Sequence, residues 1–152
     1  MNKSIKIIFV SILLFSSFIL IGCGDNQNTE TAMNNQTNTE DFEIDASSVK
    51  NKVANEENIK LIDVRTPEEY EIEHLENSEL APLQGLEINI SKIAGLEKND
   101  EIIVYCRSGR RSAEAYSILK NLGYTNVKSM AGGINEWDDQ GYKVCAGDHL
   151  TC

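Results

Sequence analysis

A cysteine followed by three arginines marks the part of the chain where chemistry is most expected. Residues 102–105 form an apolar run typical of a buried strand, and Cys106 follows this run directly. Ligands of open α/β sheets bind at the carboxyl ends of the strands, which is where this sulfur atom would lie. Arg107, Arg110 and Arg111 stand within five residues of the sulfur and favour the thiolate over the thiol. The pattern therefore predicts a cysteine nucleophile.

The backbone after Cys106 is also expected to bind an anion. Residues 112–122 carry apolar side chains at helical spacing, so a helix should begin close behind the loop. The first N–H groups of a helix are unpaired and carry positive potential. Gly109 permits a turn that a side chain would obstruct. We therefore expect a cradle of N–H groups around a thiolate or persulfide. The alternative is a small buried cysteine at a strand end, with no chemistry.

The remaining sequence predicts the elements that position this loop. We expect strands at residues 42–44, 59–64, 80–83, 101–105 and 127–130, and helices at residues 45–55, from Thr66 onward, at 88–96, at 112–122 and around Trp137. Strands that alternate with helices imply a parallel sheet covered on both faces, which is an α/β fold.

Three motifs, in this order, resemble the signatures of rhodanese domains. Residues 106–111, Cys-Arg-Ser-Gly-Arg-Arg, resemble the six-residue active loop of that family. Residues 61–70 resemble its first motif, and residues 132–144 resemble its carboxyl-terminal motif. The resemblance covers residues 42–144 and implies a rhodanese-like α/β sandwich with a central parallel sheet flanked by helices.

The resemblance also implies an enzyme, similar to a thiosulfate sulfurtransferase. Sulfane sulfur would pass from a donor such as thiosulfate, through a persulfide of Cys106, to a thiophilic acceptor such as cyanide or a thiol. Neither a cofactor nor a metal is implied. The residues expected to bind the substrate are Arg107, Ser108, Gly109, Arg110, Arg111 and Ser112.

Several other residues of the motifs are expected to be structural. Asp63 and Arg65, in the first motif, are expected to pair and brace the loop. His74 belongs to a turn signature and Trp137 should lie in the core.

The turn after the first motif departs from the family pattern. The family often has Gly-His-Ile-x-Gly-Ala there, whereas residues 73–78 read Glu-His-Leu-Glu-Asn-Ser. Asn77 is the mildest replacement for a glycine at a position that needs positive φ. Glu73 has no such property, so it predicts a locally different turn.

Two rival functions use a similar fold or loop. Phosphatases and arsenate reductases have an arginine six residues after the cysteine, but that position here is Ser112, and Arg111 stands one residue too early. A phosphate oxyanion needs a wider loop than a single sulfur atom, so the spacing favours sulfur. A noncatalytic sulfur- or anion-binding module is the other alternative. Such modules often lack the cysteine, which this chain keeps.

The amino terminus predicts export and lipidation. Residues 1–22 combine a short basic start with an apolar run, which is typical of a signal peptide, and residues 20–23 resemble the lipobox of bacterial lipoproteins. Lipidated Cys23 would then anchor an extracytoplasmic protein to the membrane. An uncleaved anchor helix is the alternative. Residues 23–41 are polar and are expected to be a disordered tether.

The carboxyl-terminal tail, residues 145–152, contains two cysteines. Outside the cytoplasm Cys145 and Cys152 are expected to form a disulfide, and free thiols are the alternative. Metal binding together with His149 is disfavoured, because structural sites usually need four ligands and three are evident.

The formal net charge of -10 argues against nucleic acid as a partner, because phosphate binding needs a basic face. The expected partners are small molecules and, through the lipid, a membrane. The globular part is expected to be one monomeric domain.

Overall fold

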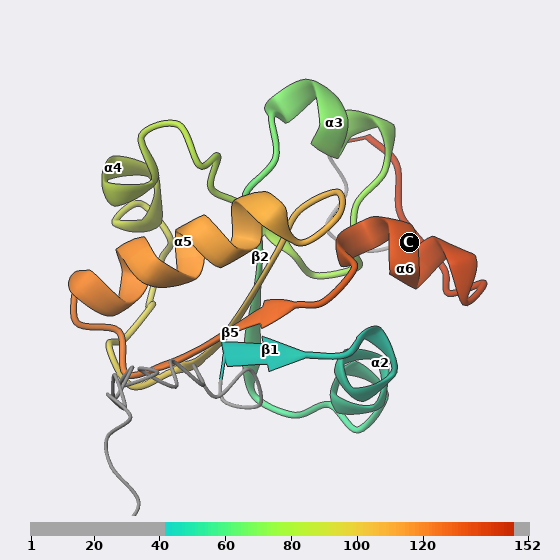
Figure 1. Ribbon diagram of the computed structural model, residues 1–152, viewed down its shortest axis with the longest axis horizontal. Coiled ribbons are helices and arrows are strands. Elements are labelled where there is room, and N and C mark those ends of the chain that lie inside the picture. Colours follow the sequence, from blue (N-terminus) through green and yellow to red (C-terminus); the bar gives the residue numbers. More distant parts are fainter. Residues whose placement is uncertain (1–41, 148–152) are drawn as a thin grey trace, which may run out of the picture. The chain divides into compact units, whose positions relative to one another are not determined.

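The computed structural model describes residues 42–147. Along the chain the elements alternate between strands and helices, and Figure 1 shows them around one sheet. They are β1 (Glu43–Ile44), α2 (Ala46–Ala54), β2 (Ile59–Asp63), α3 (Pro67–Ile72), β3 (Glu79–Leu80), α4 (Leu86–Ile90), β4 (Glu101–Tyr105), α5 (Arg110–Asn121), β5 (Asn126–Met130) and α6 (Gly133–Asp139).

The sheet has five strands in the order β1-β5-β4-β2-β3, and every pairing is parallel. This confirms the predicted α/β fold with a central parallel sheet. Strand β4 lies between β2 and β5, with Asp63 beside Tyr105 and Val104 beside Ser129. The carboxyl ends of these three strands therefore meet where Cys106 leaves the sheet.

Helices cover both faces of the sheet. Successive residues of a strand point to opposite sides, and in β4 the residues on both sides are apolar and pack against helices. Ile102 and Val104 of β4 pack into a cluster with residues of α4 and α5. Ile103 and Tyr105 pack into a second cluster with residues of α2 and α6. In Figure 1 α4 and α5 accordingly lie on one side of the sheet, and α2 and α6 lie on the other.

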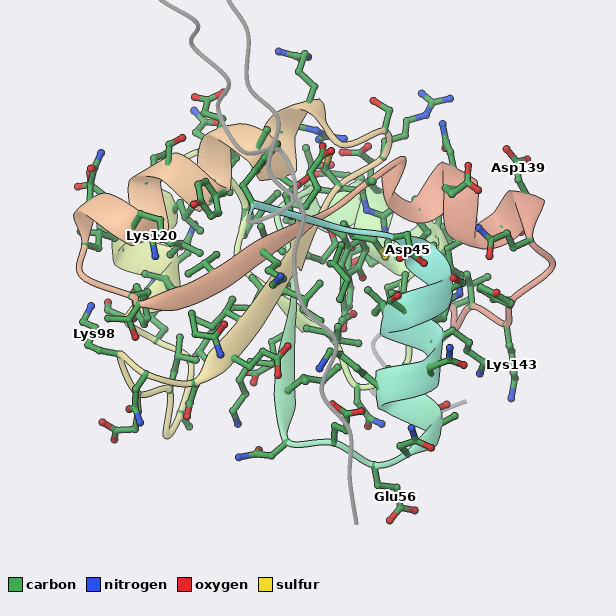
Figure 2. All side chains as sticks on the ribbon, turned by 60° about the horizontal axis from the view of Figure 1, so that its bottom comes forward. Asp45, Glu56, Lys98, Lys120, Asp139 and Lys143 are labelled. Carbon is green, nitrogen blue, oxygen red and sulfur yellow. The ribbon has the colours of Figure 1, made fainter. Side chains whose placement is uncertain are left out.

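Side-chain caps fix the starts of two helices as the sequence predicts. The carboxylate of Asp45 accepts a hydrogen bond from the backbone of Ser48 at the start of α2. Figure 2 shows Asp45 there and Glu56 beyond the other end of the same helix. At the start of α3, Thr66 and Glu69 form a reciprocal capping box, with Pro67 in the first turn.

Two elements differ from the expectation. Strand β3 ends at Leu80, and the expected extension to residue 83 contains Pro82, which has no N–H to donate to a ladder. The helix expected at residues 88–96 is the shorter α4, which ends at Ile90. Leu86 and Ile90, one turn apart, are buried, whereas the side chain of Ile88 lies between them in sequence and is 65% exposed.

Within residues 42–147 no helix is long and apolar enough to cross a membrane. The expected signal peptide, Cys23 and the tether lie outside the described residues.

Candidate active site

Cys106 occupies the first position after β4, and its side chain is directed into the loop that leads to α5. The residue is 1% exposed. The backbone N–H of Gly109 donates to the Cys106 Sγ over 3.2 Å, and the Ser112 Oγ lies 3.7 Å from the same sulfur. Gly109 adopts a φ of 95°, which only glycine tolerates readily, and the chain enters α5 directly after it. The expected cradle around the sulfur is therefore present in the loop geometry.

The environment of Cys106 favours its thiolate. Burial by itself raises the pKa of the thiol, but hydrogen bonds to the sulfur outweigh it, chiefly those from the backbone N–H groups of Ser112 and Ser108. The net result is a pKa below that of an ordinary cysteine. Since the thiolate is the nucleophilic form, the loop prepares this sulfur for attack.

A serine on the neighbouring strand β5 is hydrogen-bonded to Ser112 at the start of α5. The Ser129 hydroxyl on β5 donates to the Ser112 Oγ over 2.8 Å, and the Ser112 hydroxyl donates to the Gly109 carbonyl over 2.9 Å. Both serines are buried. The chain of hydrogen bonds ties the start of α5 to the sheet and holds the Ser112 hydroxyl near the sulfur.

Helix α6 clamps the other side of the loop. The N–H of Ile134 donates to the Cys106 carbonyl over 2.8 Å, and the N–H of Asn135 donates to the Arg107 carbonyl over 3.1 Å. A Cβ atom on Gly133 would lie 2.3 Å from the Cys106 carbonyl oxygen. The third sequence motif thus contains a glycine because the helix backbone touches the loop at this residue.

Asp63 and Arg65 form a buried ion pair directly behind the site. The carboxylate accepts from the Arg65 Nη2 over 2.7 Å and from the Nε over 2.9 Å. Arg65 Nη2 also donates to the carbonyl of Glu73, and its guanidinium lies over the Tyr105 ring. The structure therefore places these two residues in the direct contact that the sequence predicts for a bracing pair.

The three loop arginines do not share one environment. Arg111 forms a bidentate ion pair with Glu69 of α3, with distances of 2.6 and 2.7 Å. Arg107 and Arg110 are exposed, and neither has an ion-pair partner among residues 42–147. The sequence predicts that all three arginines bind the substrate, but in the structure Arg111 is already paired with a carboxylate.

His74 is buried in a structural network, in the role expected for it. Its Nδ1 lies 2.9 Å from the Tyr70 carbonyl, and its ring stacks on Tyr70. The Tyr70 hydroxyl donates to the Ser78 carbonyl, and the Ser78 hydroxyl contacts that of Tyr105. Trp137 is likewise buried in the core.

The departures from the family pattern have a local explanation. Asn77 has a φ of 59°, which is the positive value that its position predicts. Glu73 has a φ of -161°, an extended conformation that any residue can adopt. The Glu73 carboxylate lies 3.8 Å from the Arg65 guanidinium, so the side chain also adds a charge contact.

The segment around Cys145 is joined to the same region. His74 and Cys145 exchange two backbone hydrogen bonds, of 3.0 and 2.8 Å, in an isolated antiparallel bridge. Cys145 is disulfide-bonded, whereas Cys106 is free. The partner of Cys145 lies outside the described residues, as do Cys152 and His149, so the pairing with Cys152 stays a prediction. No group of potential metal ligands is found among residues 42–147.

Three residues of the site could not be singled out from the sequence alone. Glu69, Ser129 and Gly133 act through contacts with the loop from distant parts of the chain. The sequence predicts a helix from Thr66 onward, which includes Glu69, and a family motif at residues 132–144, which includes Gly133. Neither prediction indicates a contact with the Cys106 loop.

The buried cysteine follows the carboxyl end of the central strand of a parallel sheet, and a backbone N–H donates to its sulfur. This arrangement is typical of rhodanese-like domains. The model of the rhodanese-like domain family matches residues 45–140, and the chain belongs to that family.

Similar proteins support the same family assignment. The chain is 34% identical to a sulfurtransferase of Allochromatium vinosum over 104 residues, which cover 68% of this chain and 94% of the relative. It is 31% identical to the thiosulfate:glutathione sulfurtransferase of Saccharomyces cerevisiae over 124 residues, which cover 74% and 88%. The crystal structure of a rhodanese-related protein from Thermoplasma volcanium superposes with a TM-score of 0.59 at 31% identity, covering 68% of this chain and 97% of that one.

Proposed function

We propose that this protein is a sulfurtransferase that carries sulfane sulfur as a persulfide of Cys106. The observation that carries the proposal is the 3.2 Å hydrogen bond from the Gly109 N–H to the Cys106 Sγ, within a loop that lowers the pKa of the thiol. A persulfide places its negative charge one sulfur atom further out, and exposed Arg107 and Arg110 of the same loop add positive charge to this part of the surface.

The first half-reaction loads the sulfur. With thiosulfate as donor, the Cys106 thiolate attacks the sulfane sulfur, a new S–S bond forms, the S–S bond of the donor breaks, and sulfite leaves with the bonding electron pair. The charge of -3 shared by thiolate and thiosulfate equals that of persulfide and sulfite, so no proton or oxidant is needed. The backbone N–H groups stabilise the anionic sulfur before and after the step.

The second half-reaction unloads it. Cyanide, or the thiolate of a small thiol, attacks the outer sulfur, and the Cys106 thiolate is released as the leaving group. The yeast relative is described as a thiosulfate:glutathione sulfurtransferase, which supports a thiol as an acceptor class. The low pKa of Cys106 helps here as well, because a more stable thiolate is a better leaving group.

The geometry disfavours the phosphatase alternative. Ser112, the sixth residue after Cys106, is buried, and its hydroxyl is bonded to the Gly109 carbonyl. Arg111, the residue before it, is directed to Glu69. No arginine therefore stands where a phosphate oxyanion would require one.

The proposal is tested by comparing sulfur transfer from thiosulfate to cyanide with hydrolysis of an aryl phosphate on one preparation. We expect thiocyanate formation by the wild type and none by Cys106→Ser, which changes the side-chain volume little. Phosphate release without thiocyanate formation, or unchanged sulfur transfer by Cys106→Ser, would contradict the proposal.

We further propose, from the sequence alone, that the protein is an extracytoplasmic lipoprotein anchored through Cys23. Cys23→Ala should release the domain from the membrane fraction or leave the precursor uncleaved. An unmodified Cys23 in a wild-type protein that still attaches to membranes would contradict this.

A further inference from the structure

An ion pair joins the Cys106 loop to helix α3 across 42 residues of sequence. Both terminal nitrogens of Arg111 donate to Glu69, over 2.6 and 2.7 Å, one to each carboxylate oxygen. Both side chains are partly exposed, at 24% and 30%. The same Glu69 carboxylate accepts a hydrogen bond from the backbone N–H of Thr66 in the capping box of α3, which restrains its orientation. Such a fork-to-fork pair fixes the orientation of the guanidinium as well as its position.

Arg111 directly precedes Ser112, whose hydroxyl lies 3.7 Å from the Cys106 Sγ. The pKa of Arg111 is raised first by the hydrogen bonds to Glu69, and Cys106 also contributes to the rise. Glu69 in turn has its pKa lowered to about 2, first by the Arg111 side chain, so its carboxylate is ionised at any pH at which a thiolate exists. The Cys106 loop therefore carries a guanidinium whose charge is already matched by a carboxylate.

Each residue of the pair also lines a cavity. Arg111 lines one of about 470 Å³, and Glu69 lines another of about 240 Å³ together with Arg107. Arg65 lines both. A donor bound in the second cavity, next to Arg107 of the Cys106 loop, would therefore lie close to the negative charge of Glu69.

This arrangement affects donors according to their charge. A guanidinium without a partner attracts a dianion more strongly than a monoanion. A guanidinium paired with a carboxylate has little net charge, and the carboxylate repels the second negative charge of a dianion. The repulsion therefore weakens the binding of a dianionic donor more than that of a monoanionic donor that carries the same sulfane sulfur.

We propose that Glu69 is a specificity-determining positioning residue, which holds Arg111 of the Cys106 loop with its charge matched and so disfavours dianionic relative to monoanionic sulfane-sulfur donors. This inference rests on the proposed sulfur transfer through Cys106. Glu69 itself does not take part in the bond changes.

The test compares two donors that differ in charge. Thiosulfate is a dianion, and the methanethiosulfonate anion carries the same terminal sulfane sulfur with a single negative charge. Attack of the Cys106 thiolate on methanethiosulfonate forms the same persulfide and releases methanesulfinate. The quantity measured is the ratio of kcat/KM for thiosulfate to kcat/KM for methanethiosulfonate, with cyanide as the common acceptor.

Glu69→Gln is the informative variant, because glutamine can keep the capping box while it removes the charge. Glu71→Gln is the matched control: it removes the same charge from an exposed side chain of α3 two residues away, on another side of the helix. We expect Glu69→Gln to raise the ratio about threefold or more at low ionic strength, mainly through KM for thiosulfate, and less at high salt. Glu71→Gln should leave the ratio near that of the wild type.

A double variant tests whether Glu69 acts through Arg111. In an Arg111→Gln background the additional change in the ratio caused by Glu69→Gln should shrink. An equal change in that background, an unchanged ratio in Glu69→Gln alone, or an equal change in Glu71→Gln would overturn the inference. A wild type that transfers sulfur from neither donor would instead overturn the proposed function, and this inference with it.

Discussion

Two arginine–carboxylate pairs lie beside the Cys106 loop, and they differ in burial. Asp63 and Arg65 are 0% and 2% exposed, and the arginine is further bonded to a backbone carbonyl and lies over an aromatic ring. Glu69 and Arg111 are 30% and 24% exposed and border cavities that solvent can enter. The two pairs use the same chemical groups in environments of different polarity.

The difference in burial gives the two pairs different roles: the buried pair stabilises the fold, and the exposed pair can alter the charge near the Cys106 loop. A buried charge cannot lose its partner without a large cost, so Asp63 and Arg65 stabilise the contact between the end of β2 and Glu73 and cannot readily exchange partners. A partly exposed pair contributes little to stability, since water compensates for its loss. Glu69 and Arg111 can therefore adjust the charge near the sulfur without endangering the fold.

The largest expected effect comes from breaking the buried pair. Asp63→Asn leaves the buried guanidinium of Arg65 with only the more distant and partly exposed Glu73 carboxylate as counter-charge, and we expect it to lower the free energy of unfolding by about 3–5 kcal/mol. Urea denaturation followed by circular dichroism measures this. A loss below about 1 kcal/mol, which is typical of surface pairs, would show that the pair does not brace the fold.

The next effect concerns the clamp between α6 and the loop. Gly133→Ala would place a Cβ atom 2.3 Å from the Cys106 carbonyl oxygen at a φ of 61°, so the loop or the helix must move. We expect a loss of about 1–3 kcal/mol in unfolding free energy and a marked fall in sulfur transfer.

Gly141→Ala is the matched control for that clamp. Gly141 also has a positive φ, of 71°, but no atom lies within 4 Å of its Cβ position. It should lose stability only through backbone strain and keep its activity. Equal losses of activity in the two variants would refute a specific contact between Gly133 and the loop.

The smallest effect on stability is expected for the exposed pair. Glu69→Gln should change the unfolding free energy by less than about 1 kcal/mol at neutral pH. Because the pKa of Glu69 is lowered to about 2 in the folded state, its contribution is present above the ordinary carboxyl pKa and is lost as the pH falls toward 2. The difference between wild type and variant should therefore vanish on acidification, as parallel denaturation curves would show. A difference that grows toward low pH would contradict this sign.

Most of the fold could be predicted because local patterns were consistent with it. The apolar runs at residues 59–64 and 101–105, the caps at Asp45 and Thr66, and Gly123 after α5 each specify an element without reference to the rest of the chain. Helix α4 was less predictable, since its five residues contain two inward-facing side chains and an exposed isoleucine that the pattern counted as apolar.

The nucleophile could be predicted, but the roles of its neighbours could not. Cys106 is specified by its place after a strand, which is a local property. The pairing of Arg111 with Glu69 and the contact of Gly133 with the loop join residues far apart in sequence. Local patterns carry no information on such contacts, so the three loop arginines looked equivalent until the fold brought one of them to a carboxylate.

The central claim, that Cys106 carries sulfur as a persulfide, is tested most directly by mass spectrometry. Protein treated with thiosulfate, desalted and capped with iodoacetamide should carry about 32 Da, one additional sulfur atom, on the peptide that contains Cys106. Subsequent cyanide should remove this mass and release an equivalent amount of thiocyanate, and Cys106→Ser should show neither event. Absence of the added sulfur with thiosulfate and with methanethiosulfonate, in protein whose Cys106 reacts as a free thiol, would contradict the account.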